Sequence, residues 1–313
     1  MTAIQAAWRR LRARPGRRTL TIFAFRGLVD APLALPDVRL MELAAFRVKL
    51  EGIARAFSVI PLHEGMVALR RGRVAGPAAA LTFDGGFQST HDHALPLLRS
   101  MGLPATCFLT TSAIAAPRPP WFARLHRALD ETRAVTLVWR GLRVALARPE
   151  TRVDALARLR RELATLPAPE LEAEADAISR RLEVDPDVEP PRGSPWRFLD
   201  APSILAMAAS GAFAFGAASH HAAILSRMTP AAQREEIATS LCRLRELTRG
   251  PTDLFAYPGG EAGDWDENTK ELLRELGVEL AVTAVPGQCR RRTPRLELPR
   301  FVLQGDSELR TLW

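Results

Sequence analysis

The chain has 313 residues, 47% of them hydrophobic and 25% charged, with a formal net charge of +8. This composition is typical of a globular protein with a sizeable core, and it excludes a disordered, collagen-like or coiled-coil chain. No apolar run reaches the roughly 18 residues that a membrane helix needs, and the first residues lack the apolar stretch of a signal peptide. We therefore expect a cytoplasmic protein without membrane insertion.

Arginine supplies almost all of the positive charge. Of the 43 basic residues only Lys49 and Lys270 are lysines. A basic chain can bind an anionic partner such as nucleic acid or a sugar phosphate. Here the arginines are spread along the chain and form no recognition motif, so we predict no nucleic-acid partner. We assign the basic run at 1–18 to a separate N-terminal segment.

The first third of the chain alternates between predicted strands and helices. Strands are predicted at 19–26, 57–62, 78–83 and 104–109, and helices at 42–56 and 93–101. The strands are short apolar runs, whereas the helices carry apolar residues at a spacing of three and four. Gly102 follows the second helix at the position where glycine commonly ends one. This alternation predicts an α/β fold with a parallel sheet.

The middle of the chain has a different pattern. Residues 121–185 are rich in Arg, Ala, Leu and Glu at helical spacing, with a predicted strand pair at 135–145. An acidic, proline-rich linker at 185–195 closes the segment. We therefore predict a mostly helical insertion or cap over 121–195, which could also bind a protein partner through its Arg/Glu-rich faces.

The strand and helix alternation returns in the last third. Helices are predicted at 203–209, 230–248 and 268–276, and strands at 213–215, 254–257, 280–283 and 299–302. Thr229-Pro230 begins the long helix in the usual way, with proline in its first turn. The two outer thirds therefore have the same α/β character and flank the insertion.

Four stretches of the sequence follow, in order, the motifs of one family. They are LTFDGG with ALPLLRSMGLPATCFLTT at 81–111, SGAFAFGAASHHAAILSRMTPAAQREEI at 210–237, LFAYPGGEAGDWDENTKELLRELGVELAVT at 254–283, and LELPRFVL at 296–303. On these stretches the chain resembles the polysaccharide deacetylases, carbohydrate esterases with a NodB-homology domain. The resemblance covers most of 19–110 and 196–303, and the insertion only loosely.

The resemblance implies an incomplete (β/α) barrel built from 19–120 and 196–313, with the site at the carboxyl ends of the strands. It also implies hydrolytic removal of an acetyl group from a sugar. In the family a divalent metal, often zinc, is held by one Asp and two His, and a neighbouring carboxylate takes the proton of the attacking water. The expected partner is a carbohydrate or an acylated sugar.

The sequence departs from the family at the metal-ligand positions. In the family motif TFDDG the first Asp is the base and the second is a ligand; here Asp84 keeps the base position and Gly85 takes the ligand position. The two His of the motif GSH-x3-H correspond to Ala218 and Ala222. Since metal binding depends on these ligands, we expect the metal to be lost and no cofactor to be bound.

The pair His220-His221 does not restore the missing ligands. Neither residue has a second histidine at the i,i+4 spacing that the motif uses, and adjacent side chains tend to point to different sides. We predict that both line the pocket and donate or accept hydrogen bonds to a substrate. Asp84 is the single candidate catalytic residue, which alternatively caps a helix or binds a sugar hydroxyl.

Four further residues are candidates for substrate binding. Arg26 stands where close relatives have a histidine at the end of the first strand, and Arg300 matches an arginine at the barrel mouth. Tyr257 matches a strand end that shapes the groove floor, and Trp265 an aromatic residue beside the site. The two arginines could bind an anionic sugar group, although Arg300 could instead pair with Asp84.

Two functions remain open from the sequence. The first is a catalytically impaired deacetylase-like protein that binds carbohydrate or assists polysaccharide biosynthesis. The second is an active hydrolase that removes acetyl groups from a sugar through a rearranged or metal-free site. Release of acetate would separate them, and the sequence leaves enzymatic activity uncertain.

Overall fold

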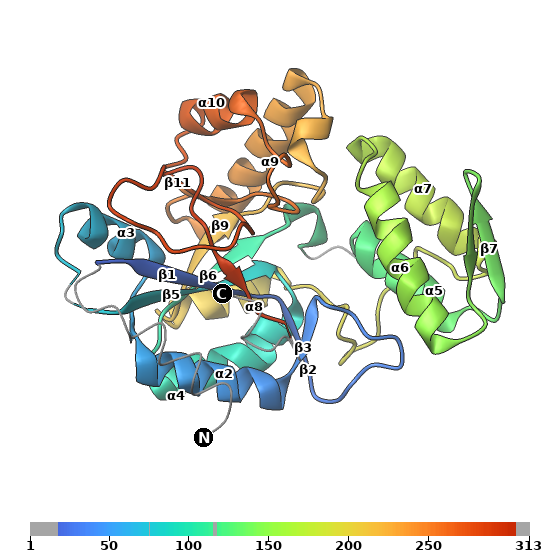
Figure 1. Cartoon of the computed structure of the whole chain (residues 1–313), viewed down its shortest axis with the longest axis horizontal. Coiled ribbons are helices and arrows are strands. Elements are labelled where there is room, and N and C mark those ends of the chain that lie inside the picture. Colours follow the sequence, from blue (N-terminus) through green and yellow to red (C-terminus); the bar gives the residue numbers. More distant parts are fainter. Residues whose placement is uncertain (1–17, 75, 115–117, 305–313) are drawn as a thin grey trace.

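The computed structural model describes residues 18–74, 76–114 and 118–304, which form a barrel and a helical insertion beside it (Figure 1). The predicted basic segment at 1–18 lies outside the described residues except for Arg18. The barrel contains the blue, teal, orange and red elements, and the insertion contains the green ones.

A parallel sheet forms the barrel wall. The strand order is β11-β10-β9-β6-β5-β1-β12, and the short β4 pairs with the beginning of β5. An isolated parallel bridge between Val282 and Leu298 also brings the segment before β12 alongside β11. Seven strands around one axis confirm the predicted incomplete (β/α) barrel. The bounds are β1 (Leu20–Phe25), β4 (Ser58–Val59), β5 (Ala78–Gly85), β6 (Ala105–Leu109), β9 (Phe213–Ala217), β10 (Leu254–Ala256), β11 (Leu280–Val282) and β12 (Phe301–Val302).

Helices cover the outside of the sheet, as the period of their apolar residues predicts. Asp200, Thr229 and Asp266 each accept a hydrogen bond from the first turn of the helix that follows them, which fixes where these helices begin. The helices are α2 (Leu43–Ala56), α4 (Leu95–Met101), α8 (Ala201–Ala209), α9 (Pro230–Thr248) and α10 (Glu267–Glu275).

The two faces of each strand have different surroundings, because successive side chains alternate. Phe25 and Phe83 point outward, and both pack edge-on against Phe46 of α2. The inward face carries small and branched residues, including Ile22 and Ala80. Helix α3 (Leu62–Arg70) closes the amino end of the barrel with buried side chains that belong to the same interior cluster: Leu62, Met66 and Leu69.

The insertion has its own hydrophobic core. It consists of α5 (Trp121–Glu131), the hairpin of β7 (Thr136–Trp139) and β8 (Leu142–Ala145), α6 (Pro149–Leu163) and α7 (Ala168–Arg181). The hairpin turns at Arg140-Gly141, both with positive φ, as two-residue hairpin loops require. The core side chains include Leu125, Leu129, Leu156, Leu159, Leu171 and Ile178.

The insertion contacts the barrel through a segment that the sequence analysis left without structure. Residues 27–42 form two short parallel strands, β2 (Gly27–Val29) and β3 (Leu40–Glu42), joined by a loop. His126 of α5 contacts the carbonyl oxygen of Leu35 in this loop through Nε2 at 2.8 Å. Arg160 of α6 pairs with Asp37 in the same loop. The insertion is thereby held beside the carboxyl ends of the barrel strands.

Candidate functional site

A cavity of about 170 Å³ lies between the barrel mouth and the insertion. The barrel contributes residues that end or follow strands, as expected for this class of fold. The insertion contributes an aromatic and apolar wall. The lining from the barrel includes Arg26, Asp84, Gly85, Ala218 and Tyr257, and that from the insertion includes Trp121, Phe122, Arg160 and Leu171.

Asp84 and Arg300 form a two-pronged ion pair below the cavity. The guanidinium donates to Oδ1 through Nη1 and to Oδ2 through Nη2, both at 2.8 Å. Arg300 is only 1% exposed, and it also donates to the Thr283 carbonyl at 2.7 Å and to the Thr82 hydroxyl at 3.1 Å. Asp84 faces the cavity, whereas Arg300 is absent from the described lining. Arg300 therefore fixes the orientation of the Asp84 carboxylate and balances its charge from below the cavity.

The three positions at which the sequence resemblance predicts the family's metal ligands meet at this cavity. Gly85, Ala218 and Ala222 all line it, yet they present only a hydrogen atom or a methyl group. Gly85 has φ +95°, and a Cβ there would lie 3.0 Å from the Phe87 ring. Ala222 also has a left-handed backbone, with φ +58°. Two of the three positions, Gly85 and Ala222, therefore have a backbone conformation that residues with larger side chains rarely adopt.

The donor set around the cavity does not fit a divalent cation. Zinc sites in proteins use at least three histidine, cysteine or carboxylate ligands. Within the described lining Asp84 is the one carboxylate, and histidine and cysteine are absent. Both oxygens of Asp84 already accept from Arg300, and further guanidinium groups surround the space. A metal ion would meet positive charge here and too few ligands.

His220 and His221 lie outside the described cavity lining and have protein partners. His220 Nδ1 lies 2.9 Å from the Thr111 hydroxyl, and His221 Nδ1 lies 3.0 Å from Oε2 of Glu236 in α9. Glu236 is 6% exposed and also accepts from the His221 backbone. His221 therefore joins the loop after β9 to α9, and His220 joins the same loop to the turn after β6.

The two histidines titrate in opposite directions. Burial, together with the neighbouring charge of His221, lowers the pKa of His220 to about 4. The hydrogen bond to Glu236 raises the pKa of His221. His220 is therefore neutral at physiological pH, and His221 holds a proton more strongly than a free histidine does.

Tyr257 and Trp265 form a stacked pair at one side of the cavity. Their ring centroids are 4.6 Å apart and the rings are inclined by 14°. Tyr257 lines the cavity, while its hydroxyl donates to the Leu296 carbonyl at 2.8 Å. Trp265 is absent from the described lining and supports Tyr257. The burial of Tyr257 raises the pKa of its phenol, so the group stays protonated.

Two arginines that the sequence analysis did not single out also line the cavity. Arg39 comes from the β2–β3 loop and lies over the Phe122 ring at 4.7 Å, and Arg160 comes from helix α6. Both are separated from the family motifs by tens of residues. In a chain with arginines throughout, only the tertiary structure distinguishes them from surface residues.

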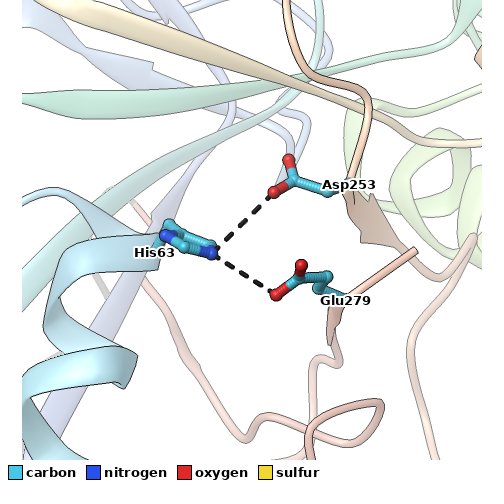
Figure 2. Close-up of side chains that lie close together, drawn as sticks. All are labelled: His63, Asp253 and Glu279. Carbon is cyan, nitrogen blue, oxygen red and sulfur yellow. Dashed lines mark ion pairs between the residues drawn. The ribbon is translucent and has the colours of Figure 1, made fainter. Parts of the chain in front are cut away.

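A separate group of possible metal ligands lies at the opposite end of the barrel (Figure 2). His63, at the beginning of α3, faces Asp253 and Glu279, which directly precede β10 and β11. Its Nε2 is 3.9 Å from Asp253 Oδ2 and 3.5 Å from Glu279 Oε2. Arg295 also approaches Glu279, at 3.8 Å. We interpret the group as a surface ion-pair cluster, because its carboxylates already have cationic neighbours.

The sequence matches the family description "Polysaccharide deacetylase" over residues 71–146 and 189–281, which is more than half of the chain. The chain belongs to the polysaccharide deacetylase family. The family acts on acetylated polysaccharides. The match is interrupted at 147–188, and it includes helix α5 and the β7–β8 hairpin of the insertion as well as much of the barrel.

Solved structures of deacetylases have the same fold. The Streptococcus pyogenes deacetylase PplD, solved with acetate, superposes with a TM-score of 0.60 at 14% identity, covering 94% of this chain and 96% of that one. IcaB from Ammonifex degensii gives 0.56 at 16% identity, with 92% and 93% covered. The de-N-acetylase from Aggregatibacter actinomycetemcomitans gives 0.56 at 10% identity, with 94% and 100% covered. At such identities the likeness concerns the fold.

Two further comparisons gave negative results. No curated protein matches the sequence significantly. Among the helices in the described ranges, none combines the length and the apolarity that crossing a membrane requires.

Proposed function

We propose that this polysaccharide deacetylase-family protein binds carbohydrate at the barrel mouth and does not carry out metal-dependent deacetylation. The observation that carries the proposal is the composition of the cavity. The positions that match the family's metal ligands are Gly85, Ala218 and Ala222, and the adjacent Asp84 is paired on both oxygens with Arg300. The site keeps a shaped cavity and lacks the donors for the family's metal chemistry.

The cavity walls support a role in binding sugars. Phe87, Trp121, Phe122 and Tyr257 give it aromatic surface, and guanidinium groups supply several N–H donors. Binding sites for small ligands combine an apolar lining with a few placed polar groups in this way. Aromatic rings can pack against the apolar face of a sugar, and arginine donors suit its oxygen atoms.

The chemistry available without a metal is limited. General acid–base catalysis by one side chain accelerates a reaction by about 10²–10⁴. Asp84 is the one carboxylate of the described lining, and both of its oxygens accept hydrogen bonds from Arg300. No described histidine lines the cavity to donate a proton to a leaving group. We therefore expect slow or absent cleavage of an acetamide.

An acetate-release assay tests the proposal together with elemental mass spectrometry of the purified protein. We expect substoichiometric zinc, nickel and cobalt, and no acetate above the buffer rate from acetylated chito-oligosaccharides or acetylated xylan. Asp84→Asn should behave like the unaltered protein in this assay. Acetate release that Asp84→Asn abolishes would contradict the proposal and would support an active hydrolase with a rearranged site.

A bound metal must be assigned to one of two places. His63→Ala removes a member of the His63–Asp253–Glu279 cluster and leaves the cavity intact. Stoichiometric metal that is lost in His63→Ala would come from the opposite end of the barrel. Metal that persists in His63→Ala and is lost in Asp84→Asn would contradict our interpretation of the cavity.

A further inference from the structure

Three guanidinium groups face the cavity, against one carboxylate. Arg26 follows β1, Arg39 lies in the β2–β3 loop and Arg160 lies on α6. The single carboxylate, Asp84, is neutralised by Arg300. Arg160 has Asp37 as a partner. Positive charge therefore remains in excess around the cavity.

Arg26 and Arg39 make no direct ion pair within the described part of the chain. The charges of Asp84 and Asp37 act on Arg26, and that of Asp37 acts on Arg39, but no described carboxylate lies within ion-pair distance of either guanidinium. The Arg39 guanidinium lies over the Phe122 ring. Burial is the main reason why the pKa of both arginines is lowered, and the charge of Arg160 lowers that of Arg39 further. Since arginine stays protonated in proteins, the fold maintains two incompletely compensated charges at a cost.

Two other donors of lining residues lack an acceptor. The indole Nε1 of Trp121 and the Nε of Arg160 are buried and make no hydrogen bond among the described residues. Trp121 as a whole is 5% exposed. Buried polar groups are satisfied in the great majority of cases. Both groups are donors, so what each lacks among the described residues is an acceptor oxygen.

The cavity is also large enough for more than a single water molecule. One water needs roughly 10–15 Å³, whereas this cavity has about 170 Å³. A planar guanidinium group can donate two parallel hydrogen bonds, in a bidentate geometry, to the oxygens of a carboxylate, sulfate or phosphate. The adjoining rings of Trp121, Phe122 and Tyr257 suit the body of a sugar.

We infer that the cavity binds an anionic saccharide, whose carboxylate, sulfate or phosphate group lies between Arg26 and Arg39 while its ring packs against the aromatic wall. This inference rests on the proposed function and specifies its ligand. Arg160, positioned by Asp37, adds a third donor from the insertion, so both parts of the chain contribute to recognition of the charge. The guanidinium groups thus give the barrel mouth a different specificity from that for a neutral acetylated sugar.

Calorimetric titration of the full chain tests the inference with three saccharides of equal length. Tri-galacturonate carries carboxylates, a sulfated trisaccharide carries sulfate, and tri-N-acetylchitotriose is neutral. We expect at least one of the acidic probes to bind about tenfold or more tightly than the neutral one. Its affinity should fall as salt rises from about 0.05 to about 0.2 M, because salt screens the charges. The tighter of the two acidic probes identifies the oxyanion.

Variants locate the binding. Arg26→Gln should lower the affinity for the preferred acidic probe about tenfold and leave the neutral probe within about twofold. Arg26→Lys should recover part of the lost affinity, since lysine keeps the positive charge but lacks the planar guanidinium group that donates two parallel hydrogen bonds. Arg158→Gln is the control, because Arg158 is exposed on the same helix as Arg160 and outside the cavity lining. Thermal melting of each variant confirms that it folds.

The outcomes separate the inference from the proposed function. Equal affinity for acidic and neutral probes, or an Arg26→Gln protein that binds the acidic probe unchanged, overturns the inference and leaves carbohydrate binding intact. Absence of binding by all three saccharides contradicts the proposed function, and the inference falls with it. Tight acidic binding that Arg26→Gln weakens and Arg158→Gln does not supports both.

Discussion

Arg160 and Asp37 form an ion pair that joins helix α6 of the insertion to the loop between β2 and β3. The side chain of Asp37 is fully buried and that of Arg160 is 12% exposed. The pair holds the insertion beside the barrel mouth and brings a third guanidinium to the cavity. Asp37 also accepts from the backbone N–H of Arg39 at 2.9 Å. One carboxylate thus positions two of the three arginines that line the site.

Replacing this carboxylate should destabilise the protein. In Asp37→Asn, Arg160 would remain buried near Arg39 without a counter-charge, and removing one partner of a buried pair costs about 3–5 kcal/mol. Denaturant unfolding monitored by tryptophan fluorescence measures the change. Glu51→Gln is the control, since Glu51 pairs with Arg55 on the surface of α2, where an ion pair contributes at most about 1 kcal/mol. Equal destabilisation by the two variants would contradict the role of the buried pair.

The same pair predicts a loss of stability in acid. Burial alone would raise the pKa of Asp37, but the charge and hydrogen bond of Arg160 offset this, and the pKa lies below its ordinary value. A lowered carboxyl pKa stabilises the folded state above the unfolded pKa of about 3.8, and this stabilisation is lost as the pH falls through the folded value. Thermal melting from pH 6 to pH 3 measures this effect. Below about pH 4 the melting temperature should fall less steeply with decreasing pH in Asp37→Asn than in the unaltered chain.

Much of the barrel could be predicted from the sequence, because its signals are local. Apolar runs such as TLTIFAFR at 19–26 and the helical spacing at 42–56 correspond to β1 and α2. The expected strand at 57–62 is reduced to β4 over Ser58–Val59, since its C-terminal part begins helix α3 instead. The strands β2 and β3 were missed. Each is only three residues long, which is too short for a clear apolar alternation in the sequence.

The candidate site was predictable only where the family motifs run through it. Asp84, Gly85, Ala218 and Ala222 were placed by the motifs, and all four line one cavity. His220 and His221 are not among the described lining residues, and their role in substrate binding stays a prediction. Their rings contact Thr111, which follows β6, and Glu236, which lies on α9. Long-range packing of this kind leaves no pattern in the neighbouring sequence.

The two histidines should give separate titrations by nuclear magnetic resonance. His220 should titrate near pH 4, and His221 above its ordinary value of 6.5. Raising the pKa of His221 stabilises the folded state fully below pH 6.5, and the effect is lost as the pH rises through the folded value. The pKa of His220 is lowered, so its effect on stability is the reverse. The folded state loses stability as the pH drops from about 6.5 towards 4.

Glu236→Gln tests the cause of these shifts. Without the carboxylate, the pKa of His221 should decrease, because its hydrogen bond to a charged acceptor is the largest contribution to the increase. Glu235→Gln is the control, because Glu235 is the exposed neighbour of Glu236 on α9. An unchanged His221 titration in Glu236→Gln would show that Glu236 is not its partner in solution.

Removing the charge of Arg26 should stabilise the protein in the absence of ligand. The Arg26 guanidinium lines the cavity, and no described carboxylate lies within ion-pair distance of it. Arg26→Gln removes a charge that burial disfavours, and we expect a gain of about 0.5–2 kcal/mol, the range common for single stabilising substitutions. Unfolding in denaturant measures it, with Arg158→Gln as the control. A destabilised Arg26→Gln protein would mean that the arginine has a structural role.

Restoring the family's carboxylate at position 85 should fail as a single change. Gly85 has φ +95°, and a Cβ there would press on the Phe87 ring at 3.0 Å. A residue with a side chain in the left-handed region costs about 1–2 kcal/mol, so Gly85→Asp should lower the free energy of unfolding by at least that amount. Gly76→Asp is the control, because a Cβ at Gly76 meets no described atom within 4 Å and φ there is not positive.

Gly85→Asp should also gain no stoichiometric zinc, since Ala218 and Ala222 still offer no ligand and Arg26 keeps its positive charge at the cavity. A Gly85→Asp protein as stable as the unaltered chain, with zinc bound at one equivalent, would show that the loop can return to a metal-binding geometry.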